Sequence, residues 1–405
     1  MTNPTKIPFL DLVTPHRQLQ EELLEVVKKA FSNAGFIGGP MVESFERDFA
    51  EFSNTKYCVG VNSGTDALRF AFMAAGIRSG DIIITVPNTF IATTEAISQA
   101  GGQIAFVDIH QQTYTMDPEK LREYVDTKCE IDRSSKSLVE SKSRRPVVGI
   151  VPVHLYGQTA DMDPILEIAQ KYGLFVIEDA CQAHGAEYFS KKENAWKRAG
   201  SMGKAAAFSF YPGKNLGACG EAGAITTNDE ALAHKMAMIR DHGQAKKYYH
   251  DMEGYNGRLD AIQAGWLSVK LRHLAKWNES RRSLAHRYHE LLEEAGGAIV
   301  VPLEASWTKG VYHLYVIRVQ DREALQVCLA EAGIGSGIHY PIPLHLQKAY
   351  RHLGYKKGDF AVTERVAAEI VSLPMFPELT HRQQEEVANN VKEFASSRIS
   401  ASQGS

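Results

Sequence analysis

The stretch FVIEDACQAHGA, residues 175–186, decides the fold class of this chain. It begins as an apolar strand and runs into Glu178 and Asp179, so it presents carboxylates at the carboxyl edge of a sheet. Ligands bind at that edge in open α/β folds. Asp179 is therefore a candidate to keep a heterocyclic nitrogen protonated, and Gln182 or His184 could bond a ring substituent. The alternative is a helix cap after the strand, because Asp is a common N-cap residue.

Short β-rich runs alternate with helical patterns through about the first 250 residues, which predicts a mostly parallel sheet covered by helices. The predicted strands are 57–61, 82–86, 104–108, 147–153, 175–178, 206–210 and 222–226. Between them, apolar side chains such as Val42, Phe45 and Phe49 recur at helical spacing and predict core-facing helices. The sequence thus predicts an α/β domain of about seven strands.

The pattern changes near residue 255, where Leu259, Ile262 and Trp266 predict one stripe of a long helix and a strand follows at 311–319. We interpret this part as a smaller α+β domain. The predicted boundaries are 1–20 for an N-terminal arm, 21–255 for the large α/β domain, 256–397 for the small domain and 398–405 for a disordered tail. Two polar insertions, 126–145 and 190–198, are expected to be exposed loops with solvated basic residues.

Composition and charge limit the classes of partner. The chain carries 45 basic and 48 acidic side chains, so it gives no electrostatic reason to expect nucleic acid or an anionic membrane. Its apolar runs are far shorter than the roughly 18 residues that span a bilayer, and its N-terminus does not resemble a secretory leader, so we expect a cytoplasmic protein. Five scattered cysteines without a CxxC pair predict reduced thiols, and neither disulfides nor a metal site.

The segment FSFYPGKNLGACGEAGA, residues 208–224, places Lys214 in a Gly-rich loop directly after a buried strand. A lysine that loses part of its solvation there could act as a nucleophile toward an aldehyde and form a Schiff base. A surface lysine in a turn is the competing interpretation. Gly217, Gly220 and Gly223 also offer a loose dinucleotide loop, and hence a nicotinamide oxidoreductase, but their spacing does not fit that motif.

A third segment, VGVNSGTDAL at 59–68, is a strand followed by a small polar turn that opens a helix. The backbone N–H groups and the dipole at a helix start can bind a phosphate, although a plain capped helix start is the alternative. Together the three segments offer a nucleophilic lysine, a carboxylate for a pyridinium and a phosphate cradle. These are the parts that a pyridoxal phosphate enzyme needs.

These motifs resemble the DegT/DnrJ/EryC1/StrS family of pyridoxal-phosphate sugar aminotransferases, which has the fold type I architecture. The resemblance begins at IPFLDL (7–12) and ends at LPMFPEL (373–379), so it covers nearly the whole chain. In family order, the motifs between them are GFIGGP, VNSGTDAL, PNTFIAT, PVHLYGQ, IEDACQAHGA, SFYPGKNLGACGEAGA, GYNGRLDAIQA and HYPIPLHLQKAY.

Matched by position, the resemblance implies roles for residues in these motifs. Lys214 is similar to the lysine that bonds to the cofactor and shuttles a proton, and Asp179 is similar to the partner of the pyridinium nitrogen. The other implied cofactor contacts are Gln182 at the ring hydroxyl, Phe90 stacked on the ring, Gly64, Thr65 and Ser209 at the phosphate, and Asn256 at the phosphate of the neighbouring subunit. The resemblance therefore implies a homodimer with shared active sites.

By the same resemblance, the reaction is a ping-pong transamination. L-glutamate gives its amine to the cofactor to leave pyridoxamine phosphate, and a keto sugar attached to a nucleotide accepts it. The stretch GSGIHYPIPLHLQKAY, residues 335–350, is most similar to members that aminate C3 of dTDP-3-keto-6-deoxyhexoses. The amino sugar would then be built into a surface polysaccharide or an antibiotic. A UDP-sugar or C4 enzyme and a non-catalytic pyridoxal-phosphate sensor are alternatives. The candidate substrate contacts, for each of which a structural role is an equal alternative, are Phe36, Ile37, His339, Tyr340 and His345.

Overall fold

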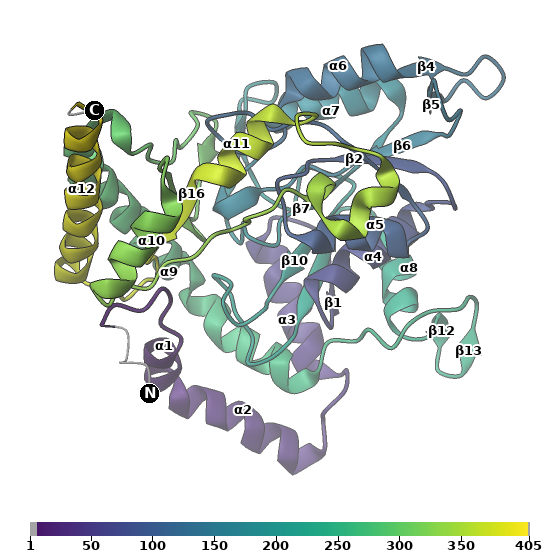
Figure 1. Cartoon of the computed structure of the whole chain (residues 1–405). Coiled ribbons are helices and arrows are strands. Elements are labelled where there is room, and N and C mark those ends of the chain that lie inside the picture. The colour runs from purple at the N-terminus through teal and green to yellow at the C-terminus, as the bar shows by residue number, and fades with distance from the viewer. Residues whose placement is uncertain (1–5, 404–405) are drawn as a thin grey trace.

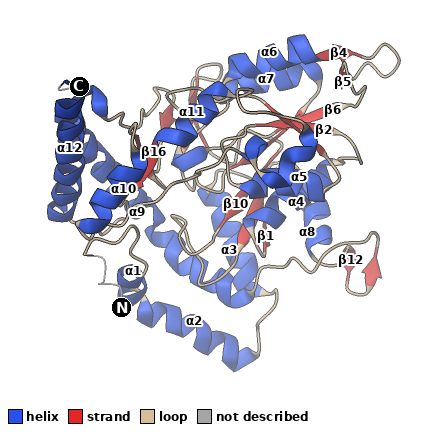
Figure 2. Cartoon of the chain, in the orientation of Figure 1, coloured by secondary structure: helices blue, strands red, loops and turns tan. Residues whose placement is uncertain are grey.

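A seven-stranded sheet lies at the centre of the computed structural model, which describes residues 6–403 (Figure 1; Figure 2). In spatial order its strands are β1 (Tyr57–Val61), β11 (Gly223–Thr227), β10 (Ala205–Ser209), β7 (Phe175–Asp179), β6 (Val147–Ile150), β2 (Ile82–Thr85) and β3 (Gln103–Phe106). Strand β11 is antiparallel to β1 and β10, and the other neighbours are parallel. The prediction of a mostly parallel seven-stranded α/β sheet is confirmed.

Helices cover both faces of the sheet because alternate residues of a strand point to opposite sides. Ala207 of β10 packs into the same core as α4, α5 and α8, whereas Phe208 packs on the other face with α3. Helices α6 and α7 pack on that second face as well, against Ile82 and Ile84 of β2. The bounds of these helices are α3 (Pro40–Phe52), α4 (Gly64–Ala75), α5 (Ile91–Gln99), α6 (Pro118–Lys128), α7 (Met162–Tyr172) and α8 (Glu230–Arg240).

The C-terminal part begins with the 32-residue helix α9 (Ala261–Leu292). The pair β15 (Tyr315–Arg318) and β16 (Ile370–Leu373) then forms a small antiparallel sheet, so the strand predicted at 311–319 is shorter than expected. The helices of this part are η2 (Glu293–Ala298), α10 (Arg322–Glu331), η3 (Leu344–Leu346), η4 (Lys348–Leu353), α11 (Ala361–Glu369) and α12 (His381–Gln403). Helix α12 thus includes residues 398–403 of the predicted tail, and residues 404–405 lie outside the described residues.

The N-terminal segment ties the two parts of the chain together. Ile7 donates its backbone N–H to the Gly333 carbonyl at 2.9 Å, beyond α10. The segment continues as α1 (Val13–Gln18) and α2 (Gln20–Asn33), and Trp266 of α9 donates its indole N–H to the Leu23 carbonyl of α2 at 2.9 Å. Residues 1–5 of the predicted arm lie outside the described residues. Within residues 6–403, the helices include none long and apolar enough to cross a membrane.

Both polar insertions form β-hairpins, which corrects the prediction of exposed loops. The first contains β4 (Cys129–Ile131) and β5 (Leu138–Glu140), and the second contains β8 (Glu187–Ser190) and β9 (Ala195–Arg198), with β14 (Thr308–Lys309) added beside β8. Leu138 and Tyr188 are buried, so each hairpin has an apolar anchor among its polar residues. The remaining elements are η1 (Leu155–Gly157) and the hairpin of β12 (Gln244–Lys246) with β13 (Tyr249–His250), which stands out from the body (Figure 1).

Candidate active site

A cavity of about 600 Å³ opens where the carboxyl ends of β7 and β10 meet the first turns of α4 and α5. Lys214, Asp179 and Gln182 line it from the large sheet side. The C-terminal part closes it with His339 and Tyr340, and the N-terminal segment adds Phe9 and Leu10. The cavity therefore joins motifs that are more than 300 residues apart in the chain, as a ligand site at the edge of a parallel sheet does.

Asp179 ends β7 and is 6% exposed. Its Oδ2 accepts a hydrogen bond from Thr93 Oγ1 at 2.7 Å, and its Oδ1 accepts one from the backbone N–H of Cys181 at 3.2 Å. The preceding Glu178 points to the other side of the strand. There it accepts from His154 Nε2 at 2.9 Å and from three backbone N–H groups, so its bonding capacity is used within the protein. Of the two carboxylates, Asp179 faces the cavity.

Lys214 lies in the turn after β10, where its backbone N–H donates to the Tyr211 carbonyl at 2.8 Å. Its side chain is partly buried in the cavity wall and not in a solvated surface turn. Burial lowers the pKa of Lys214, and the neighbouring Cys181 and Asp179 act in the opposite direction. A larger fraction of this amine is thus neutral, and able to attack a carbonyl, than of a solvated lysine.

The charge of Lys214 acts on three buried or partly buried histidines, which add no positive charge of their own. Burial and the Lys214 charge lower the pKa of His184 to about 3 and the pKa of His339 to about 4. The same two causes bring the pKa of His313 well below its ordinary value. The predicted ring contact His184 does not line the cavity: it packs between Phe208 and Phe210, behind the wall.

Gln182, Phe90 and Tyr340 form one wall of the cavity. Gln182 accepts from the backbone N–H of Tyr156 at 2.7 Å, so its amide nitrogen faces and donates to the Tyr340 hydroxyl at 3.1 Å. The rings of Tyr340 and Phe90 lie 5.5 Å apart, and His339 stacks on Phe9 at 5.5 Å. The structure thus brings two predicted cofactor contacts and two predicted substrate contacts to one place.

The first turn of α4 supplies a cradle for an anion. Ser63 caps the helix by accepting the Asp66 backbone N–H at 3.1 Å, while the N–H groups of Gly64 and Thr65 come from a turn that has no intrahelical acceptors. A Cβ on Gly64 would lie 2.6 Å from Ser209 Cβ, so only glycine lets the helix start approach β10 this closely. The predicted phosphate residues Gly64, Thr65 and Ser209 all line the cavity.

Four predicted contacts lie elsewhere. Phe36 and Ile37 are exposed and bond through their backbones to the segment at Asp260 and Ala261, and Asn256 is exposed nearby on the same segment. His345 is buried away from the cavity, because its Nε2 bonds Glu364 at 3.0 Å and its ring packs edge-on against Phe360. Within this single chain, His345 packs and bonds as a residue that fixes the η3 loop on α11.

Sequence reasoning missed Thr93 and the enclosing residues Phe9 and Leu10. Thr93 belongs to PNTFIAT, but only its aromatic residue was singled out. The signal for Thr93 is a hydroxyl in the first turn of a helix that follows a buried strand at the carboxyl edge. Phe9 and Leu10 belong to the motif IPFLDL, but only the fold places this N-terminal segment over the cavity.

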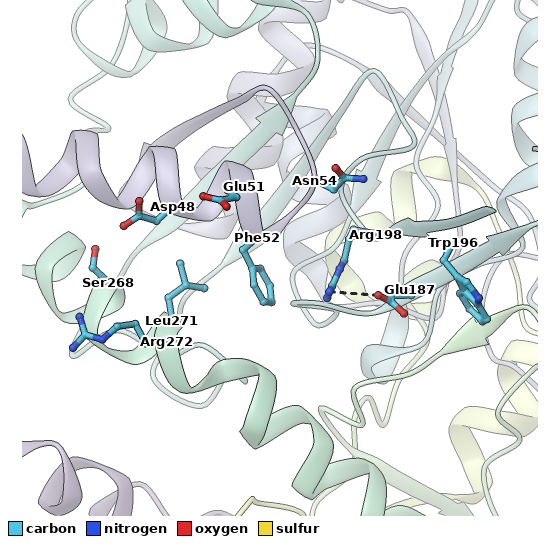
Figure 3. Close-up of a pocket in the computed structure, with 10 residues that line it drawn as sticks. All are labelled: Asp48, Glu51, Phe52, Asn54, Glu187, Trp196, Arg198, Ser268, Leu271 and Arg272. Atoms are coloured by element: carbon cyan, nitrogen blue, oxygen red, sulfur yellow. Dashed lines mark ion pairs between the residues drawn. The ribbon is translucent and has the colours of Figure 1, made fainter.

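A second hollow, of about 670 Å³, lies between the end of α3, the β8–β9 hairpin and the N-terminal half of α9 (Figure 3). Its two arginines pair with carboxylates. Arg198 bonds Glu187 at 3.4 Å, and Arg272 pairs with Glu22 of α2. Trp196 is covered by the ammonium of Lys309, 4.2 Å from the ring centre. These contacts join β8 to β9, α9 to α2 and β14 to β9, so the cations of the hollow hold neighbouring elements together.

A desolvated lysine and a carboxylate facing one cavity, beside an anion cradle at a helix start, are the groups that an α/β transferase working with pyridoxal phosphate uses. The chain belongs to the DegT/DnrJ/EryC1/StrS aminotransferase family, whose features residues 17–392 match.

Named relatives match nearly the whole length of the chain. The dTDP-3-amino-3,6-dideoxy-alpha-D-galactopyranose transaminase of Aneurinibacillus thermoaerophilus is 41% identical, over 96% of this chain and 99% of its own. A protein of Geobacillus stearothermophilus named "Pleiotropic regulatory protein" is 44% identical, over 96% of this chain and 98% of its own. The crystal structure of S. venezuelae DesV in complex with a ketimine intermediate superposes with a TM-score of 0.88 at 37% identity, covering 97% of this chain and 99% of DesV.

Proposed function

We propose that this protein is a pyridoxal-phosphate-dependent aminotransferase that moves an amino group from L-glutamate to a nucleotide-linked keto sugar. The observation that carries the proposal is the placement of Lys214 and Asp179 on one cavity of about 600 Å³. The preferred acceptor is C3 of a dTDP-3-keto-6-deoxyhexose, because the A. thermoaerophilus relative is named for a 3-amino sugar on dTDP. The product would serve amino-sugar biosynthesis in the cytoplasm.

The residues present fit the cofactor. Asp179 would hold the protonated ring nitrogen, Gln182 the ring hydroxyl, and Phe90 one face of the ring. The start of α4, with Gly64, Thr65 and Ser209, would hold the phosphate. Once bound, pyridoxal phosphate supplies the carbonyl that takes up the amino group and the ring that accepts electrons.

Lys214 would bind the cofactor covalently and then move the proton at the reacting carbon. A base in this role must be neutral, and burial favours the neutral amine by lowering the pKa of Lys214. Some members of the family lack the lysine and carry out dehydration, so the presence of Lys214 favours amino transfer. Phe9 and Tyr340 would close the cavity and exclude water from this step.

The charges of the cavity support a homodimer with shared active sites. Among the described lining residues, Lys214 is the one lysine or arginine, whereas the cofactor phosphate, the glutamate and the sugar diphosphate are all anionic. Asn256, Phe36 and Ile37 are exposed and do not line this cavity, so we assign them to the cavity of a second copy. An apolar groove along α1 and α2, with Leu12, Val13 and Leu24, gives that copy a surface to cover.

Subunit complementation tests the shared site. Lys214→Ala and Asn256→Asp chains are each expected to give nearly inactive dimers. Coexpression should restore about a quarter of the wild-type activity, because mixed dimers contain one site with both native residues. Absence of any recovery in purified mixed dimers would remove Asn256 from the partner's site.

The acceptor is tested with a panel of keto sugars and ¹⁵N-glutamate. Transfer of the label to a dTDP-3-keto-6-deoxyhexose, with slower transfer to UDP-linked and 4-keto sugars, is the expected result. A preference for a UDP sugar or for C4 would replace the preferred substrate and keep the aminotransferase. Thermal shift with dTDP and UDP alone separates recognition of the carrier from recognition of the sugar.

The second candidate is a pyridoxal-phosphate-binding regulatory protein without turnover. It is favoured by the name of the G. stearothermophilus relative. Glutamate alone discriminates the two functions, because a transaminase converts bound cofactor to its amino form without an acceptor. Failure of glutamate and of every sugar in the panel to exchange an amine would favour the regulatory protein.

A further inference from the structure

Two threonine hydroxyls form a series of hydrogen bonds that ends on Asp179. Thr89 and Thr93 stand at the start of α5, are 3% and 1% exposed, and line the cavity. Their hydroxyl oxygens lie 2.8 Å apart, and Thr93 Oγ1 lies 2.7 Å from Asp179 Oδ2. The Thr93 side chain therefore contacts the carboxylate that faces the cavity.

The direction of these hydrogen bonds follows from the chemistry of the Asp179 carboxylate, which ends the series. A carboxylate only accepts hydrogen bonds, so the Thr93 proton points to Asp179 and Thr89 must donate to the Thr93 oxygen. The other oxygen, Oδ1, accepts the Cys181 backbone N–H at 3.2 Å. With one donor on each oxygen, the plane of the carboxylate is fixed and further lone pairs remain for an N–H inside the cavity.

We propose that Thr93 is a positioning residue, which holds the Asp179 carboxylate in the orientation that bonds the ring nitrogen of the cofactor, and that Thr89 aligns the Thr93 hydroxyl. This inference rests on the proposed function, because it requires Asp179 to bond the cofactor. Thr93 acts through Asp179 and does not itself touch the reacting atoms.

The neighbouring Thr94 provides a matched control. It is fully buried in the same helix turn, but its hydroxyl bonds Tyr350 Oη at 2.7 Å and it does not line the cavity. Valine replaces either threonine with nearly the same shape and removes one buried hydroxyl. Loss of a structural hydrogen bond is thus common to both variants, and loss of the bond to Asp179 is confined to Thr93→Val.

The test measures the binding of pyridoxamine phosphate, which has no aldehyde and so cannot bond to Lys214. Thr93→Val should weaken binding roughly ten-fold or more, the effect of a lost hydrogen bond to a charged group. Thr93→Ser keeps the hydroxyl and should stay within about three-fold of wild type, as should Thr94→Val. Thr93→Ala is measured in parallel, so that the binding test can still be made if one of the two variants does not fold.

The outcomes separate this inference from the proposed function. Wild-type protein that binds no pyridoxamine phosphate would overturn the proposed function itself. Wild-type protein that binds it, with Thr93→Val and Thr93→Ala binding as tightly as Thr94→Val, would overturn only the positioning role. A shift in the pH dependence of the visible band of bound pyridoxal phosphate, seen in Thr93→Val and not in Thr94→Val, would support that role.

Discussion

The cavity at the sheet edge and the hollow beside the β8–β9 hairpin are similar in size, about 600 and about 670 Å³. They differ in whether their charged side chains form ion pairs. In the hollow, Arg198 and Arg272 have carboxylate partners at the surface. In the cavity, the described residues give Lys214 and Asp179 no ion pair, although the Asp179 charge acts on Lys214, and the hydrogen bonds to Asp179 come from neutral donors. Size therefore does not identify the reactive site, whereas desolvated groups left free to bind a ligand do.

The largest expected difference in activity is between a variant of Lys214 in the cavity and a variant of Arg272 in the hollow. Lys214→Ala should abolish the visible absorbance of bound pyridoxal phosphate and lower amine transfer by about 10³-fold or more, because it removes the group that moves the proton. Arg272→Ala in the hollow should leave both unchanged. Steady-state kinetics with glutamate and absorption spectra check this pair, and equal losses in both variants would break the comparison.

A smaller effect is expected from the carboxylates. Asp179→Asn keeps the shape but removes the charge that faces the ring nitrogen, so kcat should fall roughly 10- to 100-fold. Glu187→Gln, the matched change in the hollow, should alter kcat less than about two-fold. Stopped-flow measurement of the half-reaction with glutamate isolates the step concerned, and a normal rate in Asp179→Asn would contradict the assigned role.

Acid should destabilise the folded protein through the histidines near the cavity as the pH falls from 6.5 toward 4. His184 and His339 have folded-state pKa values of about 3 and about 4, against 6.5 for an ordinary histidine. The unfolded chain therefore binds more protons below pH 6.5, and the free energy of unfolding falls as pH drops toward 4. For the fully buried His184, the loss should be about 1–2 kcal/mol between pH 6.5 and 5.

Urea unfolding at several pH values checks this window. His184→Gln should flatten the pH dependence by that amount relative to wild type, whereas replacement of the exposed His286 should not. An unchanged slope in His184→Gln would show that this imidazole does not stay neutral in the folded protein.

The smallest effect is expected in the hollow itself. Arg198→Gln breaks the pair with Glu187, which is partly exposed, and should cost about 0.5–1 kcal/mol of stability with unchanged kcat. Thermal unfolding and the glutamate assay measure the two quantities. A marked loss of activity would show that the hollow, too, takes part in function.

The sequence predicted the features that depend on local pattern. The seven strands are apolar runs between helical periods, and Lys214 and Asp179 each follow such a run directly. Their approach to one cavity follows from the rule that parallel strands share a carboxyl edge. Family resemblance was needed for Phe90, whose ring would otherwise have been assigned to the core.

The features that escaped prediction depend on long-range packing. The hairpins at 126–145 and 190–198 looked like loops because their polar turns outweigh a few buried anchors such as Tyr188. His345 was a candidate for the pocket on its motif, but its partner Glu364 comes from a helix that sequence alone does not place beside it. Thr93 shows the same limit, since its bond to Asp179 joins residues 86 positions apart.

The covalent site of the cofactor tests the central claim most directly. Borohydride reduction of protein loaded with pyridoxal phosphate, followed by peptide mass spectrometry, should find the pyridoxyl group on Lys214. The chain offers a sharp internal control in Lys270, a second buried lysine whose ammonium is bonded to the Gly217 carbonyl at 2.7 Å and to His16. Modification of Lys270 or of surface lysines in place of Lys214, or no modification at all, would contradict the assignment of this cavity as the site of amino transfer.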